Sequence, residues 1–198
     1  LLWAWELGAA QLDERFFALL WHSLWLALQA ALITVVLATL LAFSRWRASS
    51  RQRAFLDLAQ LGYALPGSVL AVGIVISFTA VEKSLIFPLQ SLLGMEPRSL
   101  LAGTVLALLA AYWIRFLAVA SGPIDASLQR IRPSIPDAAR TLGARPSQLL
   151  WRIYLPMLRP GLLTAAILVF VDVIKEMPAT LLLRPYGWDT LAVRIYEM

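Results

Sequence analysis

The sequence predicts an all-α polytopic membrane helix bundle, and three observations support this fold class. Hydrophobic residues make up 60% of the chain and charged residues only 15%, whereas a globular protein has about 45–50% apolar residues. The apolar residues gather in four long segments with few charges, and arginines gather between them. Because cysteine is absent, a disulfide framework and a thiolate metal site are excluded. We expect residues 1–198 to form a single partial transmembrane domain.

The first two complete spans are expected at residues 24–43 and 61–80. An uncharged stretch of about 20 residues, rising ~1.5 Å per residue, crosses the ~30 Å apolar core of a bilayer. The second span contains Pro66, which lacks a backbone N–H and is expected to kink the helix. The residues that follow, 81–99, are expected to form a loop with few charges.

The third span is expected at residues 100–120 and the fourth at residues 160–177. In the third span, Gly103, Ala107 and Ala111 recur every four residues. This recurrence gives the helix a face of small side chains, which is suited to close packing against a second helix in a membrane.

Arginines give the predicted orientation of the spans. The first span is followed by four: Arg45, Arg47, Arg51 and Arg53. The polar loop at 121–159 holds six: Arg130, Arg132, Arg140, Arg145, Arg152 and Arg159. The loop at 81–99 has only one lysine and one arginine. Since cytoplasmic loops carry an excess of Lys and Arg, we expect both arginine-rich segments to lie in the cytoplasm.

Within the long loop, the sequence predicts two short helices joined at a glycine. Ser134 is a suitable N-cap, and Gly143 suits a helix end that requires positive φ. A second helix is expected at 148–154 and should end at Pro156. The first helix carries one apolar stripe, formed by Ile135, Ala138, Ala139 and Leu142. Such a helix docks into a groove of another protein, lies on the lipid surface or packs on its own helix bundle.

The motif in this loop resembles the cytoplasmic loop of permease subunits of binding-protein-dependent ABC importers, which docks onto the ATPase. The family pattern is Glu-Ala-Ala, three residues, Gly, nine residues, then Ile-x-Leu-Pro, and Asp137 stands here in place of the Glu. The resemblance assigns ATPase coupling to eight residues: Asp137, Ala138, Ala139, Leu142, Gly143, Ile153, Leu155 and Pro156. It implies the type I ABC importer fold, in which a periplasmic binding protein delivers the substrate and two ATPase subunits drive a pair of permease halves.

Three charged residues lie near the end of the fourth span. Asp172, Lys175 and Glu176 have the spacing that places them on one helical face. Charges at membrane depth normally face a cavity or a partner, so we expect these residues to line the translocation path or its outer gate. The alternative is an Asp172–Lys175 ion pair that holds the helix end in place. Two acids on one helix do not make a metal site, and no metal ligand is assigned.

Two further segments are similar to ferric-iron-type permeases, which are usually long chains of two fused halves. These segments are residues 172–185 and 189–196. The similarity implies the C-terminal half of such a permease, ferric iron as substrate, and a second half in the same longer chain. Molybdate, sulfate, thiamine and polyamines remain alternative substrates, because a fold does not fix its cargo. Residues 1–7 are expected to be the tail of a preceding helix, so the sequence is interpreted as a fragment.

The chain is not expected to be an enzyme or to bind a cofactor. It has no G-x-x-x-x-G-K-[ST] phosphate-binding motif, so ATP is expected on the partner ATPase subunits. Its one histidine, His22, is interpreted as an interfacial residue rather than a ligand. Arg115 is expected to extend toward the cytoplasmic surface, with a pore role as the alternative. The expected location is the bacterial inner membrane, as a multi-pass protein without a nucleic-acid partner. A membrane enzyme, a scaffold, and a channel or secondary carrier are the competing classes.

Overall fold

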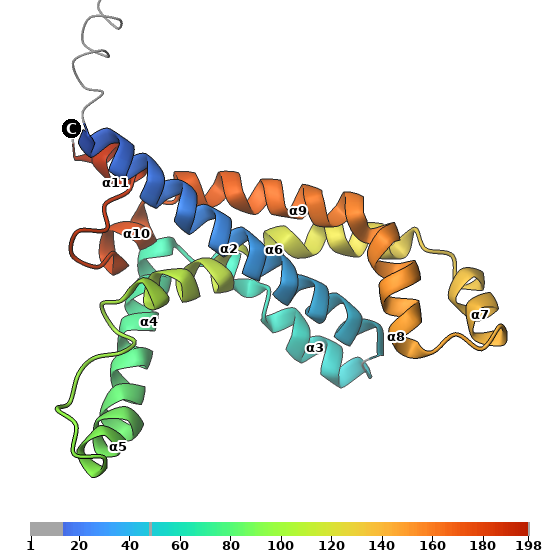
Figure 1. Cartoon of the computed structure of the whole chain (residues 1–198), viewed down its shortest axis with the longest axis horizontal. Coiled ribbons are helices and arrows are strands. Elements are labelled where there is room, and N and C mark those ends of the chain that lie inside the picture. Colours follow the sequence, from blue (N-terminus) through green and yellow to red (C-terminus); the bar gives the residue numbers. More distant parts are fainter. Residues whose placement is uncertain (1–13, 48, 198) are drawn as a thin grey trace, which may run out of the picture.

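The computed structural model describes residues 14–47 and 49–197. The helix tail expected at residues 1–7 lies outside the described residues. Among those described, all regular structure is helical and no strand occurs, so the all-α prediction is confirmed. Three long helices run beside one another: α2 (Glu14–Arg47), α6 (Val105–Gln129) and α9 (Leu155–Lys175) (Figure 1).

Shorter helices lie at the two ends of this three-helix bundle (Figure 1). Toward one end are α3 (Ser50–Leu58), α7 (Ser134–Thr141) and α8 (Pro146–Leu149). At the other end are α10 (Pro178–Leu183) and α11 (Leu191–Tyr196). The arginine-rich segments therefore share one end of the molecule, as the predicted orientation requires.

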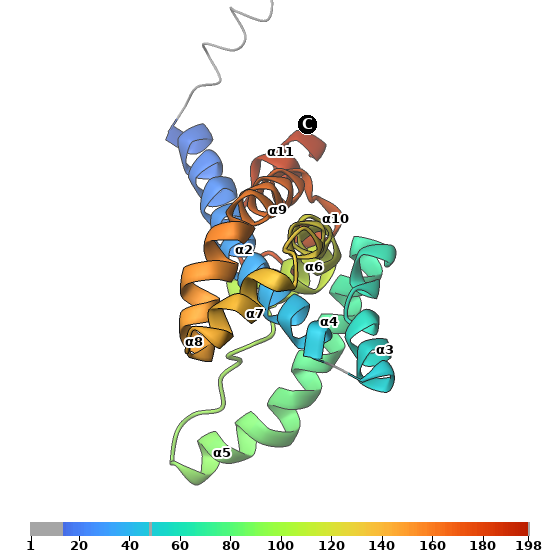
Figure 2. The same ribbon diagram turned by 90° about the vertical axis from the view of Figure 1, so that its right-hand side faces the viewer.

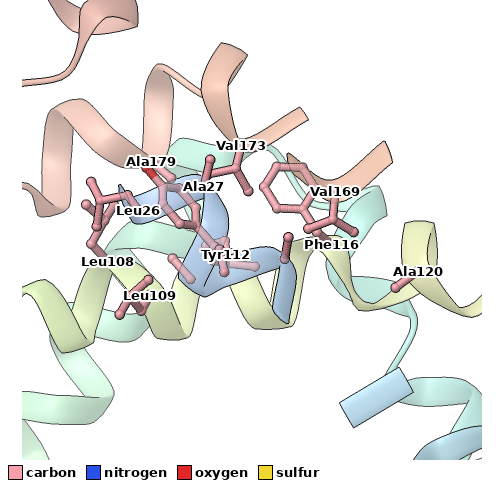
Figure 3. Packing of buried hydrophobic residues seen from close by; sticks show 14 of the residues in the cluster. Leu26, Ala27, Leu108, Leu109, Tyr112, Phe116, Ala120, Val169, Val173 and Ala179 are labelled. Carbon is pink, nitrogen blue, oxygen red and sulfur yellow. The ribbon is translucent and has the colours of Figure 1, made fainter. Parts of the chain in front are cut away.

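Small side chains let the three long helices approach closely. Ala27, Ala107, Ala111 and Ala165 are completely buried, and Figure 3 shows larger residues filling the space between the helices. A Cβ on Gly161 of α9 would lie only 2.6 Å from the carbonyl oxygen of Pro123 in α6, so the two backbones touch there. In a bilayer, such close packing replaces the hydrophobic effect as the force that joins helices.

The expected small-residue face of the third span is confirmed only in part. Ala107 and Ala111 are buried in the bundle, but Gly103 is not on the helix. Its φ of +71° places it in the turn before α6, and the helix begins at Val105 instead of residue 100. The helix also continues to Gln129, so the loop expected from residue 121 starts later.

The second span begins and ends later than expected. Residues Leu61–Ala64 form a separate 3-10 turn, η1, and Leu65 is extended. Pro66 then precedes the first helical residue of α4 (Gly67–Val81), so it starts a helix instead of kinking one. The helix runs on through η2 (Glu82–Ile86) and α5 (Phe87–Leu92), and much of the loop expected at 81–99 is helical.

Two π-helical turns precede prolines that do not end their helices, and one of these prolines is Pro156, which was predicted to end a helix. Both η2 and η3 (Leu150–Tyr154) finish two residues before a proline, Pro88 and Pro156. A proline in a helix lacks the N–H donor, and its ring clashes with the carbonyl four residues earlier. In the wider turn before Pro156, Leu155 N–H bonds to the carbonyl of Leu150, five residues back, and the helix continues through Pro156. The helical stretch that contains the fourth expected span consequently runs from Pro146 to Lys175, whereas the span itself was expected at 160–177.

The four helical stretches that are long and apolar enough to cross a membrane are therefore longer than the predicted spans. Within the described residues they are Phe16–Arg45, Gly67–Leu92, Val105–Gln129 and Pro146–Lys175. Each overlaps one of the four expected spans, which confirms their number by length and composition.

The α4–α5 stretch projects away from the other helices in both views (Figures 1 and 2). After α5 the chain returns toward the bundle through the segment before α6. The buried Glu82 holds this segment, because its carboxylate accepts hydrogen bonds from the backbone N–H groups of Leu100, Leu101 and Ala102 at 2.8, 2.6 and 3.2 Å. Apart from this anchor the stretch is mostly exposed, and large apolar side chains such as Leu85 and Leu92 cover it. Its surface has the chemistry of one that lies against lipid or another apolar partner.

The C-terminal helix is tied to the start of α2. The Ser23 hydroxyl oxygen accepts a bond from Leu191 N–H at 2.9 Å, and His22 lies 3.3 Å from the carbonyl oxygen of Asp189. The His22 ring also stacks on Trp188, with ring centres 4.7 Å apart. Among the described residues, no three His, Asp or Glu side chains form a group able to hold a metal.

Candidate functional site

The predicted glycine turn in the 134–156 segment is present. Gly143 has φ +82°, and it follows Leu142, the C-cap of α7. Its N–H bonds to the carbonyl of Arg140 at 2.9 Å, while Ala144 N–H reaches back to the carbonyl of Ala139 at 3.0 Å. This pair of bonds is a Schellman motif, which satisfies carbonyls that a helix end otherwise leaves unpaired.

The start of α7 differs from the prediction. Pro133 occupies the cap position and Ser134 is already helical, with no side-chain cap hydrogen bond. The Asp137 N–H bonds to the carbonyl of Pro133 at 3.2 Å, so backbone groups close the first turn. The Asp137 carboxylate instead pairs with Arg140 at 2.6 Å, one turn along the same helix. The acidic residue that replaces the family glutamate is thus held on the surface of α7.

The apolar stripe of α7 divides into an exposed and a packed part. Leu142 is 87% exposed and Ile135 38% exposed, and Ala138 and Gly143 are exposed beside them. Ala139 instead packs against a buried cluster at the base of the segment. The exposed part, Ile135, Ala138, Leu142 and Gly143, is called the tip below.

The other motif residues lie at the base of the segment, where it joins the bundle. Ile153 is half-buried in the second buried cluster, which is formed by Ile131, Leu149, Tyr154 and Leu158. Tyr154 meets Phe43 of α2 edge to face, with ring centres 5.5 Å apart. Leu155 and Pro156 are the first two residues of α9, and both are partly buried. The eight predicted residues therefore form a tip and a base, and the helix expected at 148–154 is continuous with α9.

An ion-pair network that the sequence did not indicate ties the same end of the bundle together. Arg45 of α2 lies 2.9 Å from Asp125 of α6 and also pairs with Asp57 of α3. All three side chains are at least partly exposed to solvent. The signal in the sequence was an acidic residue, Asp125, five residues after the expected end of the third span at residue 120.

Of the three charged residues expected on one face of the fourth span, Asp172 and Lys175 lie in α9, but Glu176 lies outside the helix. The α9 helix ends at Lys175, and Glu176 has an extended ψ of 108°. Glu176 is buried, Asp172 is half-buried and Lys175 is exposed. No ion pair joins Asp172 to Lys175 in the described part of the chain, where both residues lie. The helix stops early because Pro178 begins a new helix, α10.

Glu176 instead pairs with Arg115, which does not extend to the cytoplasmic surface as expected. Arg115 Nε lies 3.1 Å from Glu176 Oε2, and the two side chains are only 18% and 8% exposed. Arg115 Nη1 also donates to the carbonyl of Leu65 at 2.5 Å. Nearby, the hydroxyl groups of Tyr112 and Thr180 lie 2.6 Å apart. These contacts join α6 to two breaks in the helical structure, one before α4 and one before α10.

Comparisons with known proteins cover most of the chain. Residues 34–193 match the family model described as binding-protein-dependent transport system inner membrane component. The Fe(3+)-transport system permease protein FbpB 2 of Haemophilus influenzae is 29% identical over 168 residues, which cover 84% of this chain and 30% of that protein. A protein of Salmonella typhimurium named for 2-aminoethylphosphonate transport, the permease PhnV, is 29% identical over 135 residues, 68% of this chain and 45% of its own length.

A shorter similarity links the chain to the ferric transport system permease protein FbpB of Actinobacillus pleuropneumoniae. The two are 34% identical over 73 residues, 37% of this chain and 10% of that protein. The chain thus spans less than half the length of these relatives. The family model, however, covers most of the chain, including α6, α9 and the whole 134–156 segment. The chain therefore belongs to the inner membrane components of binding-protein-dependent transport systems, and it is a multi-pass protein of the bacterial inner membrane.

Proposed function

We propose that this chain is part of the permease of an ATP-driven importer and that the 134–156 segment couples it to the ATPase. The observation that carries the proposal is the exposed apolar tip at the arginine-rich end of the bundle, with Leu142 87% exposed. An isolated helix as short as α7 is marginal in water. A groove on the ATPase would both stabilise α7 and cover its apolar surface.

The base of the segment provides a route from the ATPase to the spans. Tyr154 packs on Phe43 of α2, and Leu158 is completely buried where the segment enters α9. A displacement of the tip would therefore move α9 and press on α2, since packed interiors transmit displacement instead of absorbing it. In this proposal the tip residues and Asp137 contact the ATPase, and Ile153, Leu155 and Pro156 transmit the motion.

The remaining parts of the importer would bind other surfaces. ATP would be bound and hydrolysed by the ATPase subunits and not by this chain. A second permease half would cover exposed apolar surface on the α4–α5 stretch, and a periplasmic binding protein would dock at the end that carries α10 and α11. Asp172, Lys175 and Glu176 lie toward that same end, and Asp172 and Lys175 are the candidates for lining the path.

We propose ferric iron as the substrate. Two of the three relatives described above are named for Fe(3+) or ferric transport, and one of them matches 84% of the chain. 2-Aminoethylphosphonate is the second candidate, because the relative named for it matches 68% of the chain at the same identity of 29%. The two differ in charge chemistry, since one is a hard cation and the other a phosphonate with an amino group.

Uptake by whole cells separates these candidates. Cells with and without the intact gene would be given labelled ferric iron or labelled 2-aminoethylphosphonate in the outer compartment, in a strain without other systems for either compound. Loss of iron uptake alone, restored by the intact gene, is the expected result. Loss of phosphonate uptake alone would overturn the iron assignment but keep the importer. Unchanged uptake of both compounds would overturn both assignments, and molybdate, sulfate, thiamine and polyamines would be tested next.

A further inference from the structure

We propose that Arg115 and Glu176 form an intramembrane latch that holds α10 against α4 and α6, and that Glu176 does not bind the substrate. The latch consists of these two side chains and the carbonyl of Leu65. The proposal rests on the proposed transport function, in which Arg115 and Glu176 are positioning residues for the gate. The contacts of the two side chains carry the argument.

Both oxygens of the Glu176 carboxylate are already engaged. Oε2 faces Arg115 Nε at 3.1 Å, and Oε1 accepts a hydrogen bond from Ala179 N–H at 3.3 Å. The carboxylate also lies directly against Gly67, where an added Cβ would be only 2.4 Å from Oε1. The side chain is 8% exposed, so a substrate in the path would have to displace these contacts before it reached the carboxylate.

Arg115 connects two places where the backbone leaves the helical conformation. Its Nη1 donates to the carbonyl of Leu65, an extended residue between η1 and α4. Its Nε pairs with Glu176, the extended residue between α9 and α10. Breaks of this kind absorb the φ and ψ changes of domain motion. One guanidinium group therefore holds both candidate hinges at a fixed separation.

The latch is sensitive to the loss of either charge. Removing one partner of a buried ion pair leaves the other charge buried and unpaired, which strongly destabilises the fold. Removing both charges leaves no unpaired ion. The Tyr112–Thr180 bond, 2.6 Å long, also ties α10 to α6 but contains no charge. The chain therefore offers a neutral contact of the same helix for comparison.

The test measures how accessible α10 is in the intact permease. Leu183 is 3% exposed at the end of α10. In an intact permease that carries no other reactive cysteine, Leu183→Cys reports opening through its reaction with a membrane-permeant maleimide. The rate is compared in four backgrounds: wild type, Arg115→Gln, Glu176→Gln and the double variant. Arg194→Gln in α11, which changes an exposed arginine, is the matched control, and Tyr112→Phe is the neutral comparison.

The latch predicts that each single variant increases the labelling rate about tenfold or more and reduces uptake. The double variant should be no worse than either single variant, because the two residues act as one unit. Arg194→Gln should be labelled at the wild-type rate, and Tyr112→Phe should raise the labelling rate less than the charge variants. Membrane insertion is measured for each.

Two results would overturn the latch. One is an unchanged labelling rate in both single variants. The other is an additive effect in the double variant together with lost uptake in Glu176→Gln, which would identify the carboxylate as a substrate ligand. Because labelling is measured without substrate, it tests the latch even if the chain transports neither iron nor a phosphonate.

Discussion

Replacing Gly143 with alanine tests the glycine turn that presents the tip of the 134–156 segment. Gly143 has φ +82°, and an added Cβ would meet no atom within 4 Å. The alanine side chain therefore fits, and the cost comes only from the backbone. A left-handed conformation costs an L-residue about 1–2 kcal/mol.

This conformational cost is expected to lower the affinity for the ATPase, because the glycine turn supports the docking surface on α7. α7 has only 8 residues, too few for stability without the turn and a partner. If the ATPase binds α7 in this conformation, 1–2 kcal/mol corresponds to about a five- to thirtyfold weaker affinity. Asparagine tolerates positive φ better than alanine does, so Gly143→Asn should fall between alanine and wild type. Gly143→Glu adds a charge to the apolar tip and should abolish co-purification of the ATPase.

The assay is the affinity of the intact permease, purified in nanodiscs, for its ATPase subunit. Gly122→Ala is the matched control, because Gly122 lies within α6 and an added Cβ there also meets no atom within 4 Å. The control should bind like the wild type. Equal affinities for Gly143→Ala and Gly122→Ala would refute the reasoning, since they would show that binding does not depend on the turn.

Three further predictions concern other contacts. Leu142→Asp should weaken ATPase binding about tenfold or more without lowering the thermal unfolding midpoint, since Leu142 is 87% exposed. Gly161→Ala should lower that midpoint, because the added Cβ would clash with the α6 backbone at an overpacking cost of about 1–3 kcal/mol. Gly73→Ala should leave the midpoint unchanged, because a Cβ there meets no atom within 4 Å. Arg45→Met should cost about 1 kcal/mol or less in unfolding experiments, and Arg115→Met about 3–5 kcal/mol.

Each of these predictions has a contradicting result. A lower unfolding midpoint for Leu142→Asp would mean that the side chain supports the fold instead of the partner. Equal midpoints for Gly161→Ala and Gly73→Ala would show that α6 and α9 separate without cost. Equal losses for Arg45→Met and Arg115→Met would show that burial does not distinguish the two ion pairs.

Composition and charge predicted the fold class because a membrane imposes simple requirements. Long uncharged segments such as 24–43 satisfy their backbone hydrogen bonds only as helices in lipid, so the number of spans followed from the sequence. Helix ends at prolines were less predictable. Pro156 was expected to stop a helix, but a π turn before it lets the helix continue into α9. The sequence does not indicate whether a proline will break a helix or be preceded by a wider turn.

The candidate site was predicted where its geometry is local. Gly143 and the apolar stripe of α7 lie within one short segment, so spacing along the chain was sufficient. The division into tip and base depends on packing of Tyr154 against α2, which spacing does not report. The pairing of Arg115 with Glu176 was missed for the same reason, and also because Glu176 was assigned to a helix that ends one residue before it.

Site-specific cross-linking tests most directly whether the 134–156 segment is the contact with the ATPase. A cysteine at Leu142, which is 87% exposed at the tip, is compared with a cysteine at Leu100, which is 56% exposed in the segment that leads into α6. The start of α6 and the tip lie at opposite ends of the bundle (Figure 1). The intact permease is cross-linked in membranes with the ATPase subunit that co-purifies with it. We expect a cross-linked product from position 142 and none from position 100. The same yield from both positions, or none from position 142 although the ATPase co-purifies, would contradict the docking role of this segment.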